Sequence, residues 1–373
     1  MKNVKIKSMN CAINDKILYL ISSEFNMIYE LNLITNKIEL FENLPEEKFI
    51  QSNLYGNIIF SSGKLFLVPC CAEKIWIYNI KQNIWNAVEI PDTETNRQYK
   101  FYGAFLYEEY IYMLGHYYPG IIRLDINTYN VVKININLQS KEISNYKEGY
   151  FNWDYVIKEN WLYAPIVNSN RILKLNLQTE EYQLIVVGSS KNRYSGIVWD
   201  GKYFWLPPRR NTPFVKWDGE RYIKEYCLPK EFEREQFYFC GAYLIKNKVV
   251  FSGFTKYTLE FMIDNPERAL VLNRRNNFYK QISDNMVIVQ DEGGNLYIQE
   301  GINPEKEIVC LIDESKLKKI INDKIFQAEN FKELEIIMEN SFIFLENWIM
   351  HIDTKRNSST LCDNVGKKIY DCI

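Results

Sequence analysis

A chain of 373 residues with 47% hydrophobic and 25% charged side chains has the composition of a well-packed globular protein, which excludes extensive disorder. Its 45 basic and 47 acidic residues give a formal net charge of -2, so the overall balance predicts neither nucleic acid nor an anionic membrane as partner. The N-terminal segment lacks the apolar core of a signal peptide, and no run approaches a membrane span. We therefore expect a cytoplasmic protein.

A short aromatic and apolar motif recurs along most of the chain. Its seven copies are DKILYL at Asp15, GKLFLV at Gly63, EYIYML at Glu109, ENWLYA at Glu159, GKYFWL at Gly201, NKVVFS at Asn247 and GNLYIQ at Gly294. Successive copies start 48, 46, 50, 42, 46 and 47 residues apart. A nearly fixed period in this range predicts a repeat architecture of short sheets.

Each repeat reads as four short strands. A run such as NLYGNIIF or FYGAFLY precedes the motif, a third run such as KIWIYNI or RILKLNL follows it, and polar segments such as IKQNIW and LQTEEY predict a tight hairpin before the fourth strand. One four-stranded sheet cannot bury both of its faces, so neighbouring sheets must stack around an axis. The predicted fold class is an all-β, seven-bladed β-propeller, with a six-bladed ring as the alternative.

Closure of the ring is predicted from the two ends of the repeat region. The last repeat offers the three runs DNMVIVQ, NLYIQEG and EIVCLI, while an unassigned strand precedes the first repeat. An unpaired sheet edge would leave a row of backbone donors and acceptors without partners. We therefore expect the N-terminal strand, residues 3–9, to close the last blade, so that residues 1–312 form the propeller.

The repeat resembles the kelch repeat. The segment IWIYNIKQNIWNAVEIP carries the likeness best, with an apolar strand that ends in Tyr-Asn, a polar turn, a Trp and a final Pro. The resemblance covers roughly residues 13–312. The double glycine that follows the second strand of kelch repeats is absent here and is replaced by pairs such as Pro69-Cys70 and Pro207-Pro208. The resemblance implies a propeller built from degenerate, kelch-like repeats.

The pattern changes to helical spacing from Asp313 onward. Apolar residues recur there every three or four positions, which predicts a small α-helical C-terminal extension over residues 313–373. This extension either packs on the ring or, because its apolar stripe is broad, forms a homodimer or partner interface.

One loop face of the propeller is the predicted binding site. Loops after each fourth strand and between second and third strands gather on one face around the channel, and here they are rich in aromatic and basic residues. Four aromatic residues occupy matching places at the starts of innermost strands, where they either ring the channel mouth or pack the blade tops: Tyr55, Tyr102, Tyr194 and Phe239. Five basic residues suit a carboxylate or phosphate: Arg97, Arg193, Arg209, Arg210 and Lys256.

The sequence offers little support for catalysis. Its two histidines, His116 and His351, are too few for a His-rich metal site, and no nucleotide-binding or metal motif is present, so we expect no metal and no cofactor. His116, with Tyr117 beside it, is the candidate base of a lyase, while Glu148, Asp154 and Glu235 could supply carboxylates for hydrolysis.

Eight cysteines are spaced without a CxxC pattern, and we expect free thiols, with the adjacent pair Cys70 and Cys71 the one unusual feature.

The leading hypothesis is a non-catalytic binding or scaffold propeller for a peptide, a protein or an acidic saccharide. The alternative is a carbohydrate-active lyase or hydrolase on the same face.

Overall fold

The computed structural model describes residues 3–23, 26–45, 53–91, 98–138, 149–167, 169–210, 212–232, 238–253, 256–283, 285–300 and 306–313. All of them belong to one compact unit, Met1–Asn322, and the remainder of the chain, Asp323–Ile373, forms a second unit. The predicted helical extension, residues 313–373, lies outside the described residues except for Asp313.

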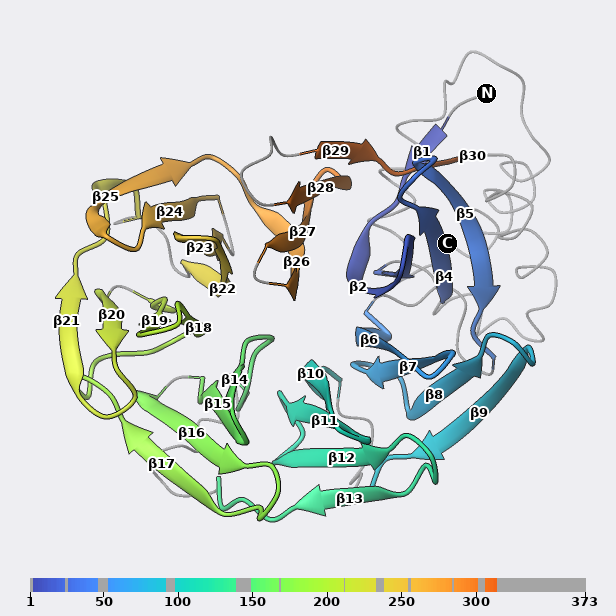
Figure 1. Cartoon of the computed structure of the whole chain (residues 1–373), viewed down its shortest axis with the longest axis horizontal. Helices are drawn as coiled ribbons and strands as arrows, with labels where there is room; N and C mark the ends of the chain where they lie inside the picture. The colour runs from blue at the N-terminus through green and yellow to red at the C-terminus, as the bar shows by residue number, and fades with distance from the viewer. Residues whose placement is uncertain are drawn as a thin grey trace, which may run out of the picture. The chain divides into compact units, whose positions relative to one another are not determined.

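Seven four-stranded antiparallel sheets form a ring, which confirms the seven-bladed propeller and excludes the six-bladed alternative (Figure 1). Blades one and two are β2 (Ser8–Asn14), β3 (Ile17–Ser22), β4 (Met27–Asn32), β5 (Lys37–Asn43), and β6 (Tyr55–Ser61), β7 (Lys64–Pro69), β8 (Lys74–Asn79), β9 (Ile84–Glu89). Blades three and four are β10 (Phe101–Tyr107), β11 (Tyr110–Gly115), β12 (Ile121–Asp125), β13 (Val131–Ile134), and β14 (Val156–Lys158), β15 (Trp161–Pro165), β16 (Arg171–Asn176), β17 (Tyr182–Val186). Blades five and six are β18 (Val198–Trp199), β19 (Phe204–Leu206), β20 (Phe214–Trp217), β21 (Tyr222–Tyr226), and β22 (Phe239–Ile245), β23 (Lys248–Gly253), β24 (Thr258–Met262), β25 (Asn265–Leu272). Blade seven is β26 (Asn276–Ser283), β27 (Met286–Asp291), β28 (Asn295–Glu300) and β29 (Lys306–Val309).

The strands of each blade follow one another in chain order, with the first strand innermost and the fourth outermost (Figure 1). A short 3₁₀ helix, η1 (Lys230–Phe232), precedes blade six. No helix among the described residues is long and apolar enough to cross a membrane.

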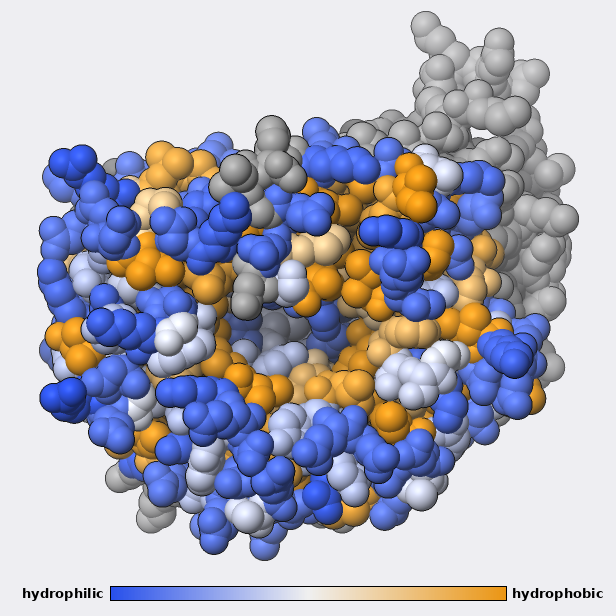
Figure 2. Space-filling model, in the orientation of Figure 1, coloured by the Kyte–Doolittle hydropathy of each residue, from blue (hydrophilic) through white to orange (hydrophobic). Residues whose placement is uncertain are grey.

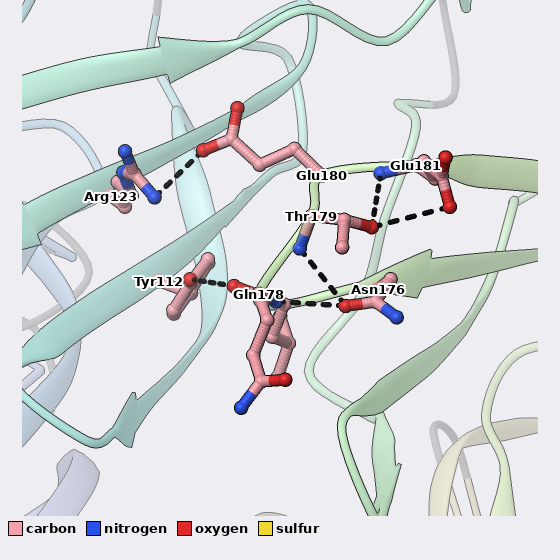
Figure 3. Close-up of polar contacts among 8 residues, drawn as sticks. Tyr112, Arg123, Asn176, Gln178, Thr179, Glu180 and Glu181 are labelled. Atoms are coloured by element: carbon pink, nitrogen blue, oxygen red, sulfur yellow. Dashed lines mark hydrogen bonds and ion pairs between the residues drawn. The ribbon is translucent and has the colours of Figure 1, made fainter.

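The hairpins between third and fourth strands share one local device. An Asn or Asp at the end of the third strand accepts hydrogen bonds from backbone N–H groups two or three residues further on, as Asn176 does from Gln178 and Thr179 (Figure 3). The same turn is built on Asn32, Asn79, Asp125 and Asp218. Short polar side chains stabilise turns in this way, which is why the polar segments predicted these hairpins correctly.

The hydrophobic cores lie between neighbouring blades. One cluster, for example, joins Phe105 and Tyr112 of blade three to Leu162 and Leu173 of blade four. A hydrogen bond also joins these two blades, since the Tyr112 hydroxyl donates to the Leu177 carbonyl at 3.0 Å (Figure 3). Burial of apolar area between sheets is therefore what holds the ring together.

An ion pair adds to this blade-to-blade contact. Arg123 on β12 lies 2.7 Å from the Glu180 carboxylate in the turn between β16 and β17 (Figure 3). Both side chains are about one-third exposed or less, so the pair is partly screened and contributes roughly 0.5 to 1 kcal/mol.

Ring closure differs from the expectation that residues 3–9 form the outer strand of the last blade. That blade takes its outer strand from β29, and β1 (Asn3–Lys5) instead pairs with β30 (Leu311–Asp313) in a separate two-stranded sheet. The reason is that the last copy of the motif was assigned to the wrong strand. The copy at Gly294 was read as a second strand, but it forms the third strand of its blade, and MVIVQD forms the second. The first strand, β26, was therefore not recognised in the sequence.

The two ends of the ring are also joined by a buried side chain. The Gln290 carboxamide accepts from the Ser8 backbone N–H at 2.7 Å and donates to the Ile6 carbonyl at 3.0 Å. The N-terminal segment thus ties blade one to blade seven through hydrogen bonds rather than by completing a sheet.

Candidate functional site

Three of the four predicted channel-mouth aromatics lie in the cores between blades. Tyr55, Tyr194 and Phe239 are 1%, 0% and 1% exposed, so they do not line an open site. Tyr102 differs from these three residues. In blade three it is Phe101 that occupies the position of Tyr55, because Phe101 pairs with Gly115 just as Tyr55 pairs with Pro69. Tyr102 is the extra residue of a β-bulge at the start of β10, and a bulge re-aims its side chain.

Tyr102 belongs to a half-buried aromatic cluster on the loop face, formed by Tyr99, Tyr102, His116, Tyr117 and Trp153. The rings of Tyr102 and Trp153 are stacked, with centroids 4.3 Å apart and planes inclined by 15°. His116 lies 4.5 Å from Tyr102 and 4.7 Å from Tyr117, and Tyr99 lies 6.3 Å from both tyrosines. This aromatic cluster spans blades three and four.

Sequence reasoning missed two members of the aromatic cluster, Tyr99 and Trp153. Trp153 occupies the same place before its blade as Tyr102 does in blade three, as the pairing of the two innermost strands shows. Its signal is its position before the first strand of the blade, but the sequence before β14 is too irregular to align with the other first strands. Tyr99 stands in a loop with a positive φ of 58° and carries no repeat signal.

His116 is a packed residue of the aromatic cluster rather than a surface group. It is 7% exposed, and its Nδ1 donates to the Phe151 carbonyl at 2.6 Å. Gly149, at φ +83°, packs so closely on the imidazole that a Cβ there would overlap the ring. Burial, together with the charge of Arg209, lowers the pKa of His116 to about 4. The imidazole is therefore neutral at physiological pH and a weak base.

The basic residues divide into groups with different surroundings. The Arg193 guanidinium donates to the carbonyls of Ser190 and Asn192, at 2.7 and 2.6 Å, and so holds its own loop. Arg209 is partly buried; its backbone N–H donates to the Arg193 carbonyl at 2.8 Å, which places these two arginines side by side.

The remaining basic residues are more peripheral. Arg210 is exposed, and exposed Lys256 lies 5.0 Å over the ring of Tyr257 in its own loop. Arg97 lies outside the described residues. The structure thus brings Arg193 and Arg209 together at the top of blade five. Arg209 is close enough to the aromatic cluster for its charge to lower the pKa of His116.

The buried carboxyl group of Asp154 accepts hydrogen bonds from residues of three other blades. One carboxylate oxygen accepts from the Ala242 N–H at 2.6 Å and the Ile197 N–H at 3.3 Å, and the other accepts from the Tyr279 hydroxyl. These partners come from blades five, six and seven, and a Cβ at Gly196 would overlap the carboxylate. Burial raises the pKa of Asp154 to about 7. The partners of this carboxyl group among the described residues are all protein groups, and through them it links blades five, six and seven. Glu148 and Glu235 lie outside the described residues.

A cavity of about 300 Å³ occupies the centre of the ring, among the innermost strands. Figure 2 shows that one face of the molecule is hollowed at this place. The cavity is lined by Trp153, Asp154, Asn10, Asn57 and Lys280, with other residues of the innermost strands. The Lys280 ammonium donates to the Asn57 carboxamide oxygen at 3.1 Å, and burial lowers the pKa of this lysine.

Two adjacent cysteines, Cys70 and Cys71, lie beside the aromatic cluster. The Cys70 and Cys71 thiols contact one another, and the pKa of Cys71 is lowered, first by its hydrogen bond with Cys70 and further by the Lys100 charge. Lys100 is 4% exposed and donates to the Ala72 carbonyl at 2.9 Å. Within the described ranges, no group of three or more His, Cys, Asp or Glu side chains could hold a metal ion.

The fold is similar to that of solved propellers at low sequence identity. Virginiamycin B lyase from Staphylococcus aureus superposes with a TM-score of 0.60 at 12% identity, covering 81% of this chain and 99% of that one. Hsv2 from Kluyveromyces lactis gives 0.51 at 11%, covering 82% and 100%, and BamB from Moraxella catarrhalis gives 0.50 at 14%, covering 79% and 85%. Neither a known protein family nor a curated protein matches the sequence. These likenesses show the propeller fold alone, and the kelch-like repeat stays a prediction.

Proposed function

We propose that this protein is a non-catalytic binding propeller whose loop face over blades three to five holds an acidic peptide segment of a protein partner. The observation that carries the proposal is the half-buried aromatic cluster beside Arg209. Tyrosine, tryptophan and arginine contribute most of the binding energy in protein interfaces. The aromatic rings would cover apolar side chains of the peptide, and the guanidinium would pair with a carboxylate.

The geometry of His116 favours binding over catalysis. A general base works best when its pKa lies near the operating pH, and burial places that of His116 about three units lower. Its Nδ1 is engaged by the Phe151 carbonyl, and Gly149 packs on the ring. Because the same fold carries lyases and other proteins, the fold itself does not choose between the two functions.

Selection of peptides on the immobilised protein tests the proposal. Peptides enriched from a random display library are expected to carry Asp or Glu next to an aromatic or aliphatic residue. Their affinity, measured by calorimetry, should fall by about 30-fold or more in the double variant Tyr102→Ala, Arg209→Ala, because one hot-spot aromatic and one charged hydrogen bond each contribute on the order of 1 to 3 kcal/mol.

The matched control is the double variant Tyr222→Ala, Arg268→Ala, which removes an exposed tyrosine and an exposed arginine from the outer strands β21 and β25. It should bind the selected peptides as the unmodified protein does. The proposal fails if no acidic peptide is enriched, or if the Tyr102 and Arg209 variant retains full affinity while both variants unfold at the same temperature as the parent.

A further inference from the structure

The central cavity contains a positive charge without a counter-charge among the described residues. Lys280 lies on β26, the innermost strand of blade seven, and its ammonium reaches the Asn57 oxygen of blade two. No Asp or Glu carboxylate in the described part of the chain lies within 4 Å of this ammonium. The nearby Cys11 thiol does not supply a counter-charge, because burial raises its pKa to about 12.

Asp154, the one Asp or Glu among the residues that line the cavity, is engaged by other partners than Lys280. Its oxygens accept hydrogen bonds from Ala242, Ile197 and Tyr279. Burial favours the protonated, uncharged form of this carboxyl group. An ammonium in a partly buried site is costly unless an anion or several acceptors surround it.

A second donor points to the same kind of ligand. Asn10, on the innermost strand of blade one, lines the cavity, and its carboxamide oxygen accepts from the Cys11 backbone N–H at 2.8 Å. Its NH₂ group is therefore the end that remains for another partner. Two donors, one of them charged, match the oxygens of a carboxylate.

Cavity size limits what can bind. A volume of about 300 Å³ is at the lower end of the range for small-molecule sites. It suits a molecule no larger than a sugar acid, and Trp153 and Trp199 among the lining residues provide apolar contact. A folded partner or an oligosaccharide would not fit inside.

We propose that the central cavity binds a small monocarboxylate whose carboxylate group accepts hydrogen bonds from the Lys280 ammonium and the Asn10 carboxamide. This site shares Trp153 with the aromatic cluster, but the donors that hold the carboxylate, Lys280 and Asn10, lie outside that cluster, so the proposal does not rest on the peptide site. It assigns a ligand to the inside of the ring, whereas the proposed function concerns its rim.

The test is a binding panel of lactate, gluconate and galacturonate, with galactose as the neutral counterpart of galacturonate, followed by ligand-observed NMR and calorimetry. At least one carboxylate should bind and galactose should not. In Lys280→Gln the affinity for that carboxylate should fall about 10- to 100-fold, as expected for loss of a charged hydrogen bond. Lys306→Gln, an exposed lysine on β29 of the same blade, is the control and should leave binding unchanged.

A footprint on the unmodified protein keeps the test decisive if Lys280→Gln does not fold. Acetylation of Lys280, followed by mass spectrometry, should slow when the bound carboxylate is added. The proposal is overturned if none of the three carboxylates binds, if Lys280→Gln folds and binds equally well, or if Lys280 is acetylated at the same rate with and without ligand. Arg209→Ala, which leaves Trp153 and its stacking partner Tyr102 in place, should weaken peptide binding but still bind the carboxylate, so this proposal and the peptide site fail or hold separately.

Discussion

Replacement of Asp154 tests whether one buried carboxyl group links the blades of the ring. In Asp154→Ala, three donors lose their acceptor: the N–H groups of Ala242 and Ile197 and the Tyr279 hydroxyl. A buried donor without a partner costs about 1 to 3 kcal/mol, so the free energy of unfolding should fall by on the order of 3 to 5 kcal/mol. That is a large fraction of the roughly 5 to 15 kcal/mol by which proteins are stable.

Asp154→Asn has the same shape and should behave differently. Its carboxamide oxygen can accept from both backbone N–H groups, and its NH₂ group can donate to the Tyr279 hydroxyl after that hydroxyl rotates. At pH 5, where the native carboxyl group is protonated, we expect a loss of less than about 1 kcal/mol. The contrast with Asp154→Ala isolates the hydrogen bonds from the charge.

The pH dependence of this contrast has a definite sign. The pKa of Asp154 is raised from 3.8 to about 7 in the folded protein. Between these values the folded chain keeps a proton that the unfolded chain has lost, so stability from this group falls as pH rises towards 7 and is constant above it. One pKa unit corresponds to about 1.4 kcal/mol. From pH 5 to pH 8 the wild type should therefore lose on the order of 3 kcal/mol relative to Asp154→Asn.

Urea unfolding of the wild type, Asp154→Asn and Asp154→Ala, followed by tryptophan fluorescence at pH 5 and pH 8, measures both effects. The difference between wild type and Asp154→Asn cancels the other titrating groups, because both proteins contain them. The reasoning is refuted if this difference is the same at the two pH values, or if Asp154→Asn is as unstable as Asp154→Ala at pH 5.

Two further predictions concern a turn and a thiol. Glu108, exposed between β10 and β11, has a φ of 52°, which costs a non-glycine residue about 1 kcal/mol. Glu108→Gly should therefore raise the melting temperature slightly, whereas Glu109→Gly at the next position should lower it. A lower melting temperature in both variants would contradict this explanation. Cys71, whose pKa is lowered by Cys70 and by the Lys100 charge, should react with iodoacetamide at a rate that changes less between pH 7 and pH 9 than it does in the urea-unfolded chain. Cys70→Ala, which removes the largest of the effects that lower this pKa, should restore a steeper pH dependence. Equal pH profiles in folded and unfolded protein would show that the thiol is unperturbed.

The sequence alone determined the repeat and the local structure within each blade. Alternating apolar residues identified the buried strands, and an Asn or Asp at the end of the third strand marked the hairpins. These features depend on residues close together in the chain, whose geometry follows from the two-residue period of a strand and the hydrogen bonding of a turn. They were sufficient to predict a seven-bladed propeller.

The candidate sites depended on one-residue differences that the repeat did not reveal. Tyr55 and Tyr102 each precede a glycine and looked equivalent, yet the strand pairing aligns Tyr55 with Phe101. Tyr102 aligns instead with Gly56, because both are the extra residue of a β-bulge that the two blades share. In the last blade, a shift of one strand hid β26, and with it Tyr279 and Lys280. An extra residue at a strand start changes the direction of the next side chain, and sequence spacing does not show where it lies.

Only the closed ring decided which distant side chains meet. Asp154 reaches partners up to 125 residues away in the chain, and Lys280 meets Asn57 at a separation of 223 residues. Neither pairing has a sequence signal, because each depends on the radius of the channel and on the order of the blades around it. The sequence determined the blades, and the tertiary structure determined what lies between them, because contacts across a ring are set by its closure rather than by the chain on either side.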